Sequence, residues 1–508
     1  MSLSVFLLWL VSIHICHIHA NPAPRGFLLN CGASGEISMG SLRWITDEGF
    51  VSGGNTTTIN TPGVLPILST LRFFPDKSAR KNCYVIPVIK GGKYLVRTTY
   101  YYGGFDGGNE PPVFDQIIEG MKWSIVNTTE DYAQGLSSYY EIIVVAHGKT
   151  LSVCLARNEH TVSSPFISTL ELENLEDSTY NSTDFHEYAL STVARNSFGY
   201  DGDIISFPDD QYNRYWHPFK VGETSTVEGY PIVDSQANVT SSDFWNLPPT
   251  KAFWSGINTS RGKILDLKWP LLSLPSTNYY IVLYFQDNRN PSPYSWRVFN
   301  VSINGKLFYR DLNVTAAGVT VFATDWPLSG QTEIIMTPEV GMRVGPIINA
   351  GELFQLMPIA ARTITRDVMA MEELQRSLTN PPSDWHGDPC LPHENSWTGV
   401  TCSDGKQARV IKLNLTNAGL SGSLPPSVSS LTALTHIWLG GNKFTGQIPD
   451  LSSLNELVSL RLDNNEFEGP IPESLGNLNN LQELYLQNNK LTGPVPDALT
   501  KRSGITVQ

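Results

Sequence analysis

The C-terminal part of the chain repeats with a nearly constant period, and this repeat restricts the possible folds more than any other feature of the sequence. Each repeating unit of 23 or 24 residues supplies one strand and one return segment, and it cannot bury its apolar side alone. Successive units must therefore stack, so residues 410–508 are predicted to form a solenoid of four repeats. The apolar pairs that define the period, at steps of 24, 23 and 24 residues, are Leu413/Leu415, Ile437/Leu439, Leu460/Leu462 and Leu484/Leu486.

Two other positions recur in register with these pairs. Asparagine fills the first of them at Asn442, Asn465 and Asn489, whereas Ala418 replaces it in the first repeat. This combination is typical of a leucine-rich-repeat solenoid, an α/β architecture. Each repeat ends on Gly-x-hydrophobic-Pro, at residues 422–425, 446–449, 469–472 and 493–496.

The region before the repeats is predicted to be mainly β. It holds short runs rich in β-branched and aromatic residues, at 94–102, 141–146, 151–156, 279–286 and 298–303. The last run meets Asn304-Gly305 and continues as 306–309, which predicts a hairpin. Many short strands with turns between them favour sandwiches over a parallel α/β sheet. Because the region is long for one sandwich, we expect two similar halves, at residues 21–178 and 179–360.

Residues 361–409 link the β region to the repeats. Val368, Met371, Leu374 and Leu378 recur at helical spacing and predict a helix over residues 365–378. The helix ends before the prolines of residues 380–382, which cannot continue it.

The first twenty residues have the layout of a cleavable export signal. An apolar stretch from Val5 to Ile13 is followed by the small residue Ala20. The stretch is too short to span a bilayer, and no other run of about 18 apolar residues follows. The mature protein is therefore predicted to start near Asn21 and to be secreted to the extracellular space or cell wall. Histidines and Cys16 within the signal would be lost with it, so no metal or cofactor is predicted.

The net charge of −13 argues against nucleic acid or an anionic membrane as a partner, because either requires a basic face. An exported chain forms disulfides, and Cys390 and Cys402 are the nearest pair. We also expect Cys31 to bond Cys83, with Cys154 left as a buried thiol in its apolar run. For an exported chain we expect glycosylation at the Asn-x-Ser/Thr sites. These are Asn55, Asn127, Asn181, Asn238, Asn258, Asn300, Asn313 and Asn414.

Several segments carry a family resemblance. Residues 385–390 and 397–402 resemble the cysteine-paired cap that precedes the repeats of plant receptors. Upstream, the chain resembles the malectin-like domains of plant receptor kinases. The order of the parts matches the ectodomain of those kinases, and the chain ends at Gln508 without a membrane span or kinase. The resemblance thus implies a secreted, kinase-less relative or a truncated product. The malectin-like strings lie at residues 30–32, 70–75, 82–84, 94–98 and 207–210.

The residue between the two core leucines of each repeat points outward from the concave face. This column contains Asn414, Trp438, Arg461 and Tyr485. Trp, Arg and Tyr are enriched at binding hot spots, so we expect a peptide or protein partner here. The alternative is a solvated strand face that tolerates aromatic residues. The flanking positions add His436 and Glu483 on one side, and Asp463 and Gln487 on the other.

The resemblance to malectin, which binds a glucose oligosaccharide, raises the question of a sugar site. Sugars are held by aromatic rings and a few polar groups. In the first half, Tyr100, Tyr102, Phe105 and Asp106 lie at a strand end and its Gly-rich loop, where such a site could form. A core role for these rings is the alternative.

The predicted function is extracellular recognition without catalysis. The partner is a secreted peptide or receptor ectodomain, with a cell-wall oligosaccharide as a second possibility. A passive cell-wall scaffold is one alternative. The other is a glycan-active enzyme, which would need two carboxylates about 5 to 10 Å apart across a cleft. Most candidate aspartates stand beside Gly or Pro, where Asp serves the turn itself. No nucleophile or phosphate-binding motif is present.

Overall fold

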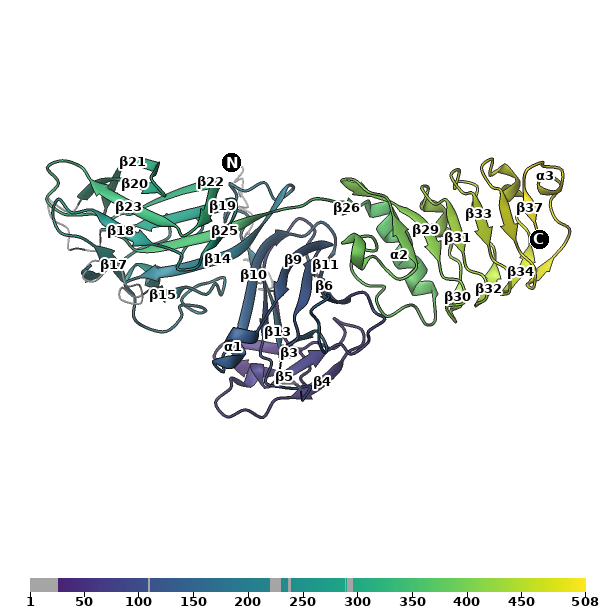
Figure 1. Cartoon of the computed structure of the whole chain (residues 1–508), viewed down its shortest axis with the longest axis horizontal. Coiled ribbons are helices and arrows are strands. Elements are labelled where there is room, and N and C mark those ends of the chain that lie inside the picture. Colours follow the sequence, from purple (N-terminus) through teal and green to yellow (C-terminus); the bar gives the residue numbers. More distant parts are fainter. Residues whose placement is uncertain (1–25, 108–109, 220–229, 236–238, 288, 290–295) are drawn as a thin grey trace, which may run out of the picture.

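The computed structural model describes residues 26–107, 110–219, 230–235, 239–287, 289 and 296–508. Two β-rich units precede a solenoid, and Figure 1 shows the first unit lying between the second unit and the solenoid. The predicted export signal and the acceptor Asn238 lie outside the described residues. Within those ranges, no helix is long and apolar enough to cross a membrane.

One sheet runs through both β-rich units. The units meet where β10 and β14 pair antiparallel, with Ile142 opposite Ser191 and Ile143 opposite Leu190. The predicted tandem of β-sandwiches is confirmed, and the two halves share this sheet. Its strands, in spatial order, are β2 (Ile37–Met39), β3 (Leu42–Thr46), β1 (Gly26–Asn30), β13 (Thr169–Leu175), β7 (Lys93–Tyr100), β10 (Ser138–Val145), β14 (Tyr188–Phe198), β25 (Ala350–Pro358), β19 (Leu274–Phe285) and β22 (Val319–Gly330), with β15 (His217–Phe219) beside β14.

A four-stranded sheet forms the second layer of each unit. In the first unit it is β6 (Asn82–Pro87), β11 (Thr150–Arg157), β8 (Phe114–Ile118) and β9 (Met121–Val126). In the second unit it is β18 (Leu265–Lys268), β23 (Glu333–Pro338), β20 (Trp296–Ile303) and β21 (Lys306–Thr315). Fully buried residues such as Val96 and Val153, or Ile281 and Val301, form the two cores. Asn304 and Gly305 join β20 to β21 with positive φ angles of 47° and 74°, as a two-residue hairpin turn of this kind requires.

The remaining elements of the β-rich units are short. Two three-stranded sheets lie outside the main layers, with a short helix and two 3₁₀ turns. They are β4 (Asn55–Thr58), β5 (Thr70–Phe73) and β12 (Phe166–Ile167); β16 (Ile232–Asp234), β17 (Ser255–Asn258) and β24 (Ile347–Ile348); α1 (Thr129–Ala133), η1 (Pro66–Leu68) and η2 (Thr250–Phe253).

A ladder of alternating charge crosses the shared sheet where the units meet. Glu171, Arg97, Glu141, Arg195 and Glu352 come from the adjacent strands β13, β7, β10, β14 and β25, and all are buried. Each guanidinium contacts the carboxylates on both sides, at N–O distances between 2.6 and 2.9 Å. Opposite charges on neighbouring strands stabilise a sheet, and here the pairing also satisfies charges that burial would otherwise make very costly.

The solenoid begins with the predicted helix, which spans Thr365–Ser377 as α2. Its concave sheet contains β27 (Val400–Cys402), β29 (Val410–Asn414), β31 (His436–Trp438), β33 (Ser459–Arg461), β35 (Glu483–Tyr485) and β37 (Thr506–Val507). The second sheet contains β30 (Ser421–Ser423), β32 (Lys443–Gln447), β34 (Glu466–Pro470) and β36 (Lys490–Thr492). Short elements complete the unit: β26 (Arg362–Thr363), β28 (Gln407–Ala408), η3 (His393–Asn395), η4 (Pro426–Ser430), η5 (Glu473–Asn477) and α3 (Asp497–Thr500).

The repeated asparagines tie neighbouring turns together from inside. The Asn465 amide donates to the carbonyl oxygens of Leu439 and Leu462 at 2.9 and 3.1 Å. Its oxygen accepts from the N–H of Phe444 at 3.0 Å. Asn442 and Asn489 repeat this pattern. Each side chain thus satisfies backbone groups that the tight turn leaves unpaired.

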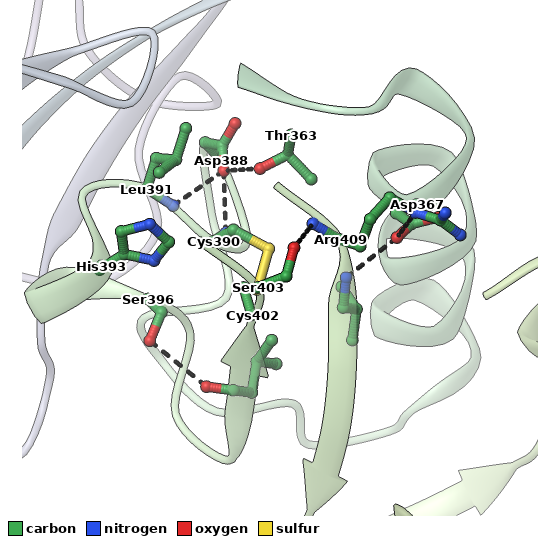
Figure 2. The surroundings of a disulfide bond; sticks show 12 residues. Thr363, Asp367, Asp388, Cys390, Leu391, His393, Ser396, Cys402, Ser403 and Arg409 are labelled. Atoms are coloured by element: carbon green, nitrogen blue, oxygen red, sulfur yellow. Dashed lines mark hydrogen bonds and ion pairs between the residues drawn. A yellow bond between two sulfur atoms is a disulfide. The ribbon is translucent and has the colours of Figure 1, made fainter. Parts of the chain in front are cut away.

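The cap of the solenoid is closed by the predicted disulfide between Cys390 and Cys402, which is confirmed. Figure 2 shows Asp388 organising the loop around this bond. Its carboxylate accepts hydrogen bonds from the N–H groups of Cys390 and Leu391 at 2.8 and 2.9 Å, and another from the Thr363 hydroxyl. The loop is therefore held in one conformation by both covalent and polar contacts.

The same loop docks on the first unit. The buried ammonium of Lys81 donates to the carbonyl oxygens of Asp388 and Leu391 at 2.5 and 2.9 Å. Asn395 donates to the carbonyl oxygen of Arg80 at 2.9 Å. Gly387 lies so close that an added Cβ would approach two cysteine sulfurs of the first unit at 3.1 Å. Close polar contact of this kind fixes the solenoid against the first unit.

Those sulfurs belong to Cys83 and Cys154, which form the second disulfide. The predicted bond between Cys31 and Cys83 is wrong, and so is the free thiol at Cys154. The strands β6 and β11 pair in a register that sets Cys83 directly opposite Cys154, with their Cα atoms 3.9 Å apart. Cys31 follows β1 in the other layer as a buried free thiol, and burial raises its pKa.

Candidate recognition surface of the solenoid

The predicted binding column is aligned by the parallel register of the concave sheet. Asn414 lies opposite Trp438, Trp438 opposite Arg461, and Arg461 opposite Tyr485. In each strand the neighbouring leucine or isoleucine turns into the core, so these side chains turn outward. Asn414 is exposed, and the other three are half-buried.

The three large side chains of the column contact one another. The guanidinium carbon of Arg461 lies 5.1 Å from the ring centre of Trp438 and 5.0 Å from that of Tyr485. A cation between two aromatic rings is attracted by both, and this packing restricts the rotamers of all three side chains. The arrangement therefore presents rings that are already ordered before any partner arrives.

Polar contacts fix the same side chains. Arg461 pairs with Glu483 at 2.9 Å, and the Trp438 indole donates to the Ser459 hydroxyl at 2.8 Å. That hydroxyl in turn donates to Glu483 at 2.7 Å. The hydrogen bonds from Ser459 and Arg461 lower the pKa of the Glu483 carboxyl, so it stays ionised at neutral pH. Sequence reasoning missed Ser459, although it occupies the same flanking column as His436 and Glu483.

The remaining predicted residues lie around this group. The His436 ring meets the Trp438 ring edge to face, with centres 5.2 Å apart. Burial, followed by the charge of Lys412, lowers the pKa of His436. Asp463 accepts from the side-chain amide of its neighbour Asn464 at 2.6 Å. Gln487 is half-buried on the same side of the column as Asp463.

Of the four residues predicted for a sugar site in the first unit, Tyr100 and Tyr102 are buried, Phe105 is half-buried and Asp106 is exposed. Tyr100 and Tyr102 are 0% and 1% exposed, and both rings pack in the core. The Tyr100 hydroxyl donates to Gln116 at 2.9 Å, and the Tyr102 hydroxyl donates to Asp106 at 2.6 Å. Phe105 is half-buried between other rings. Covered rings offer no face to a sugar, so the core role is the correct interpretation of these tyrosines.

Most predicted glycan acceptors lie where a glycan could attach. Two, Asn258 and Asn300, are half-buried. The exposed ones are Asn55, Asn127, Asn181, Asn313 and Asn414.

Comparison with known proteins relates this architecture to plant receptors. The malectin-like domain matches residues 29–356, and the leucine rich repeat N-terminal domain matches residues 365–403. The leucine rich repeat matches residues 456–478 and 480–501. The Arabidopsis thaliana leucine-rich repeat receptor-like serine/threonine-protein kinase At2g14510 is 29% identical over 81% of this chain and 47% of its own length. Receptor-like protein kinase At3g21340 of the same plant is 30% identical over 83% and 47%.

The chain spans about half the length of the curated relatives that it matches. Among solved structures, the ANX2 ectodomain from Arabidopsis thaliana is 18% identical, with a TM-score of 0.53 over 65% of this chain and 96% of that one. The plant receptor-like kinase FER gives 19% and 0.54 over the same shares. A complex of the plant peptide RALF23 with FER and LLG2 gives 18% and 0.52, over 66% and 95%. These structures share the fold of the tandem, and the chain belongs to the malectin-like domain family.

Proposed function

We propose that this chain is a non-catalytic extracellular recognition protein that binds a secreted peptide or a receptor ectodomain through the concave face of repeats two to four. The column of Trp438, Arg461 and Tyr485 carries the proposal. The Arg461 side chain at its centre is 41% exposed, so a partner can still reach it.

The physical advantage of the column is its order in the free protein. A partner that packs on flexible side chains must first immobilise them, at a cost of about 0.5–1.5 kcal/mol for each rotamer-rich residue. Here Arg461 is already held by two rings and by Glu483, so most of that entropy is lost on folding.

The related structures favour a peptide or protein partner. The complex of RALF23 with FER and LLG2 contains a plant peptide, and FER shares the fold of the tandem. That likeness covers 66% of this chain and supports the class of partner. The binding surface is inferred from the contacts within the repeats. Extracellular delivery of the chain, with glycans on its exposed acceptors, is part of the same proposal.

The first repeat is expected to take no part in binding. Asn414 is exposed at the end of the column, opposite Trp438, and it is a glycan acceptor. A glycan at this position would cover the neighbouring strand face, which confines a partner to repeats two to four. Mass spectrometry that finds Asn414 unmodified in the purified protein would remove the basis for this restriction.

The proposal is tested with the double substitution Trp438→Ala and Tyr485→Ala. The full chain is immobilised and screened against a secreted-peptide library and a glycan array. A retained peptide should bind the variant at least about 30-fold more weakly, since each hot-spot residue contributes about 2 kcal/mol or more. Tyr309→Ala is the matched control, because this tyrosine is exposed on β21 of the second unit.

The outcomes separate the candidate functions. Equal retention of every peptide by the parent and the variant would contradict binding through the column. No selective retention at all would favour a passive scaffold. Turnover of a cell-wall oligosaccharide by the purified chain would favour an enzyme and would contradict the non-catalytic assignment.

A further inference from the structure

The shared sheet divides where the two β-rich units meet. β10 and β14 are paired only at residues 142–143 and 190–191. Further along, residues 196–198 of β14 pair with β15. Between these two pairings, residues 192, 194 and 195 have a strand partner on one side only, which is β25. On the other side, their edge has no strand partner within the described parts of the chain, so backbone donors and acceptors are left for another strand.

A cleft of about 630 Å³ lies along this open edge. Its volume falls in the range of about 300–1,000 Å³ that is typical of ligand sites. Tyr139 and His217 form one part of the lining and share a hydrogen bond of 2.6 Å. Leu271 and Leu272 form an apolar part and are 45% and 48% exposed. Exposed leucines beside unpaired strand edges suit a ligand that offers both a backbone and an apolar side chain.

The strand itself is irregular at this position. The register of β14 with β25 shifts between Thr192 and Ala194, so that Val193 is an extra residue in β14. Such bulges re-aim the neighbouring side chains and are over-represented beside functional sites. Thr192, Val193 and Ala194 all line the cleft. The irregularity therefore coincides with the open edge.

The charged side chains that line the cleft neutralise each other. Glu141 and Arg195 both line it, are 2% and 3% exposed, and pair at 2.6 Å. Among the described residues, the lining therefore has no unpaired carboxylate or guanidinium group to attract a charged ligand. This charge balance favours an uncharged ligand.

We propose that this cleft binds an extended, uncharged peptide segment that adds to the open edge of β14. The backbone of the segment would pair with residues 192–195, and an apolar side chain would pack on Leu271 and Leu272. This is strand addition, in which main-chain hydrogen bonds supply affinity and side-chain pockets supply specificity. The site is separate from the solenoid column and does not depend on it.

The test uses the full chain and a library of N-acetylated, C-amidated heptapeptides that lack charged residues and contain one Leu, Ile or Phe. Leu271→Asp with Leu272→Asp places two charges on the apolar wall at exposed positions, where the fold tolerates them. We expect the best peptide to bind this variant at least about tenfold more weakly. Leu307→Asp is the matched control, because Leu307 is 47% exposed on β21, and it should bind as the parent does.

Two further measurements decide the proposal. Bound peptide should slow hydrogen exchange of the amides in residues 192–195, and the Trp438→Ala, Tyr485→Ala variant should retain full affinity. Loss of binding in that variant, or unchanged binding in the Leu271→Asp, Leu272→Asp variant, would place the peptide elsewhere and overturn the proposal. A library without any peptide of Kd below about 1 mM would overturn it as well. Of these results, only loss of binding in the Trp438→Ala, Tyr485→Ala variant would also concern the solenoid column.

Discussion

The tandem and the solenoid satisfy their buried polar groups in opposite ways. In the tandem, five charged residues from five adjacent strands form a single ladder, and they come from positions 97 to 352 of the chain. In the solenoid, Asn442, Asn465 and Asn489 each satisfy the backbone of their own turn and its neighbour. The first arrangement depends on long-range packing, whereas the second is repeated locally.

This difference determines how far damage spreads. Removing Glu141 or Arg195, the two central members of the ladder, leaves charges unpaired on both neighbouring strands, and those strands belong to two units. Removing one asparagine affects two adjacent turns, since a solenoid is stabilised by the sum of contacts between neighbours. The comparison predicts that a substitution in the ladder destabilises the whole tandem, whereas a substitution of one asparagine destabilises only the adjacent turns of the solenoid.

The largest effect is expected for Glu141→Gln. Glu141 contacts both Arg97 and Arg195, so the substitution leaves two buried guanidinium groups with one carboxylate fewer. Breaking a buried pair in this way costs about 3–5 kcal/mol. Denaturant unfolding of the full chain should show this loss in the transition of the tandem. Glu36→Gln breaks an exposed pair with Arg43 and should cost less than about 1 kcal/mol.

The carboxyl of Glu141 also limits the stability of the folded protein at low pH. Burial alone would raise the pKa of Glu141, but the charges of Arg195 and Arg97 outweigh it and hold the pKa at about 2. A lowered folded-state pKa gives stability that is present above the unfolded value of about 4.3 and is lost as the pH falls towards 2. The parent should therefore lose about 3 kcal/mol in this window, and Glu141→Gln should lose distinctly less. Parallel acid curves for the two proteins would contradict the role of this residue.

A smaller and local effect is expected for Asn465→Ala. The change leaves the carbonyl oxygens of Leu439 and Leu462 and the N–H of Phe444 without this partner. Unsatisfied buried groups cost about 1–3 kcal/mol. Hydrogen exchange should accelerate in repeats two and three, while the tandem stays protected. Asn480→Ala removes one exposed hydrogen bond and serves as the control. Faster exchange throughout the tandem would show that the two regions unfold together.

The smallest effect is expected at the contact between the two regions. Lys81→Met removes the donor to the carbonyl oxygens of Asp388 and Leu391 but also removes a buried charge, whose pKa burial lowers to about 8. Loss of the hydrogen bonds destabilises the protein, whereas removal of the buried charge stabilises it. We expect the free energy of unfolding to fall by about 1 kcal/mol. Hydrogen exchange should rise in the cap loop with little change in the unfolding midpoint. An unchanged cap loop would show that other contacts suffice for docking.

The repeats were the most predictable part of the molecule. Their period, the alignment of Trp438, Arg461 and Tyr485, and the positions of the asparagines all follow from contacts between neighbouring turns. The hairpin at Asn304-Gly305 and the helix of residues 365–377 were predictable for the same reason. Even Ser459 could have been found, because it occupies a flanking column that the period defines.

Pairing between strands that are distant in the chain could not be predicted from the sequence. The partner of Cys83 depends on the register of β6 with β11, and the burial of Tyr100 and Tyr102 depends on which layer covers them. The division of the shared sheet at Arg195 likewise exists only because two units diverge there. The amino-acid order determined the solenoid, since each turn is specified by residues close in sequence. Tertiary packing determined the Cys83–Cys154 disulfide, the burial of Tyr100 and Tyr102, and the cleft beside β14. The residues of a strand do not specify which distant strand will lie beside it.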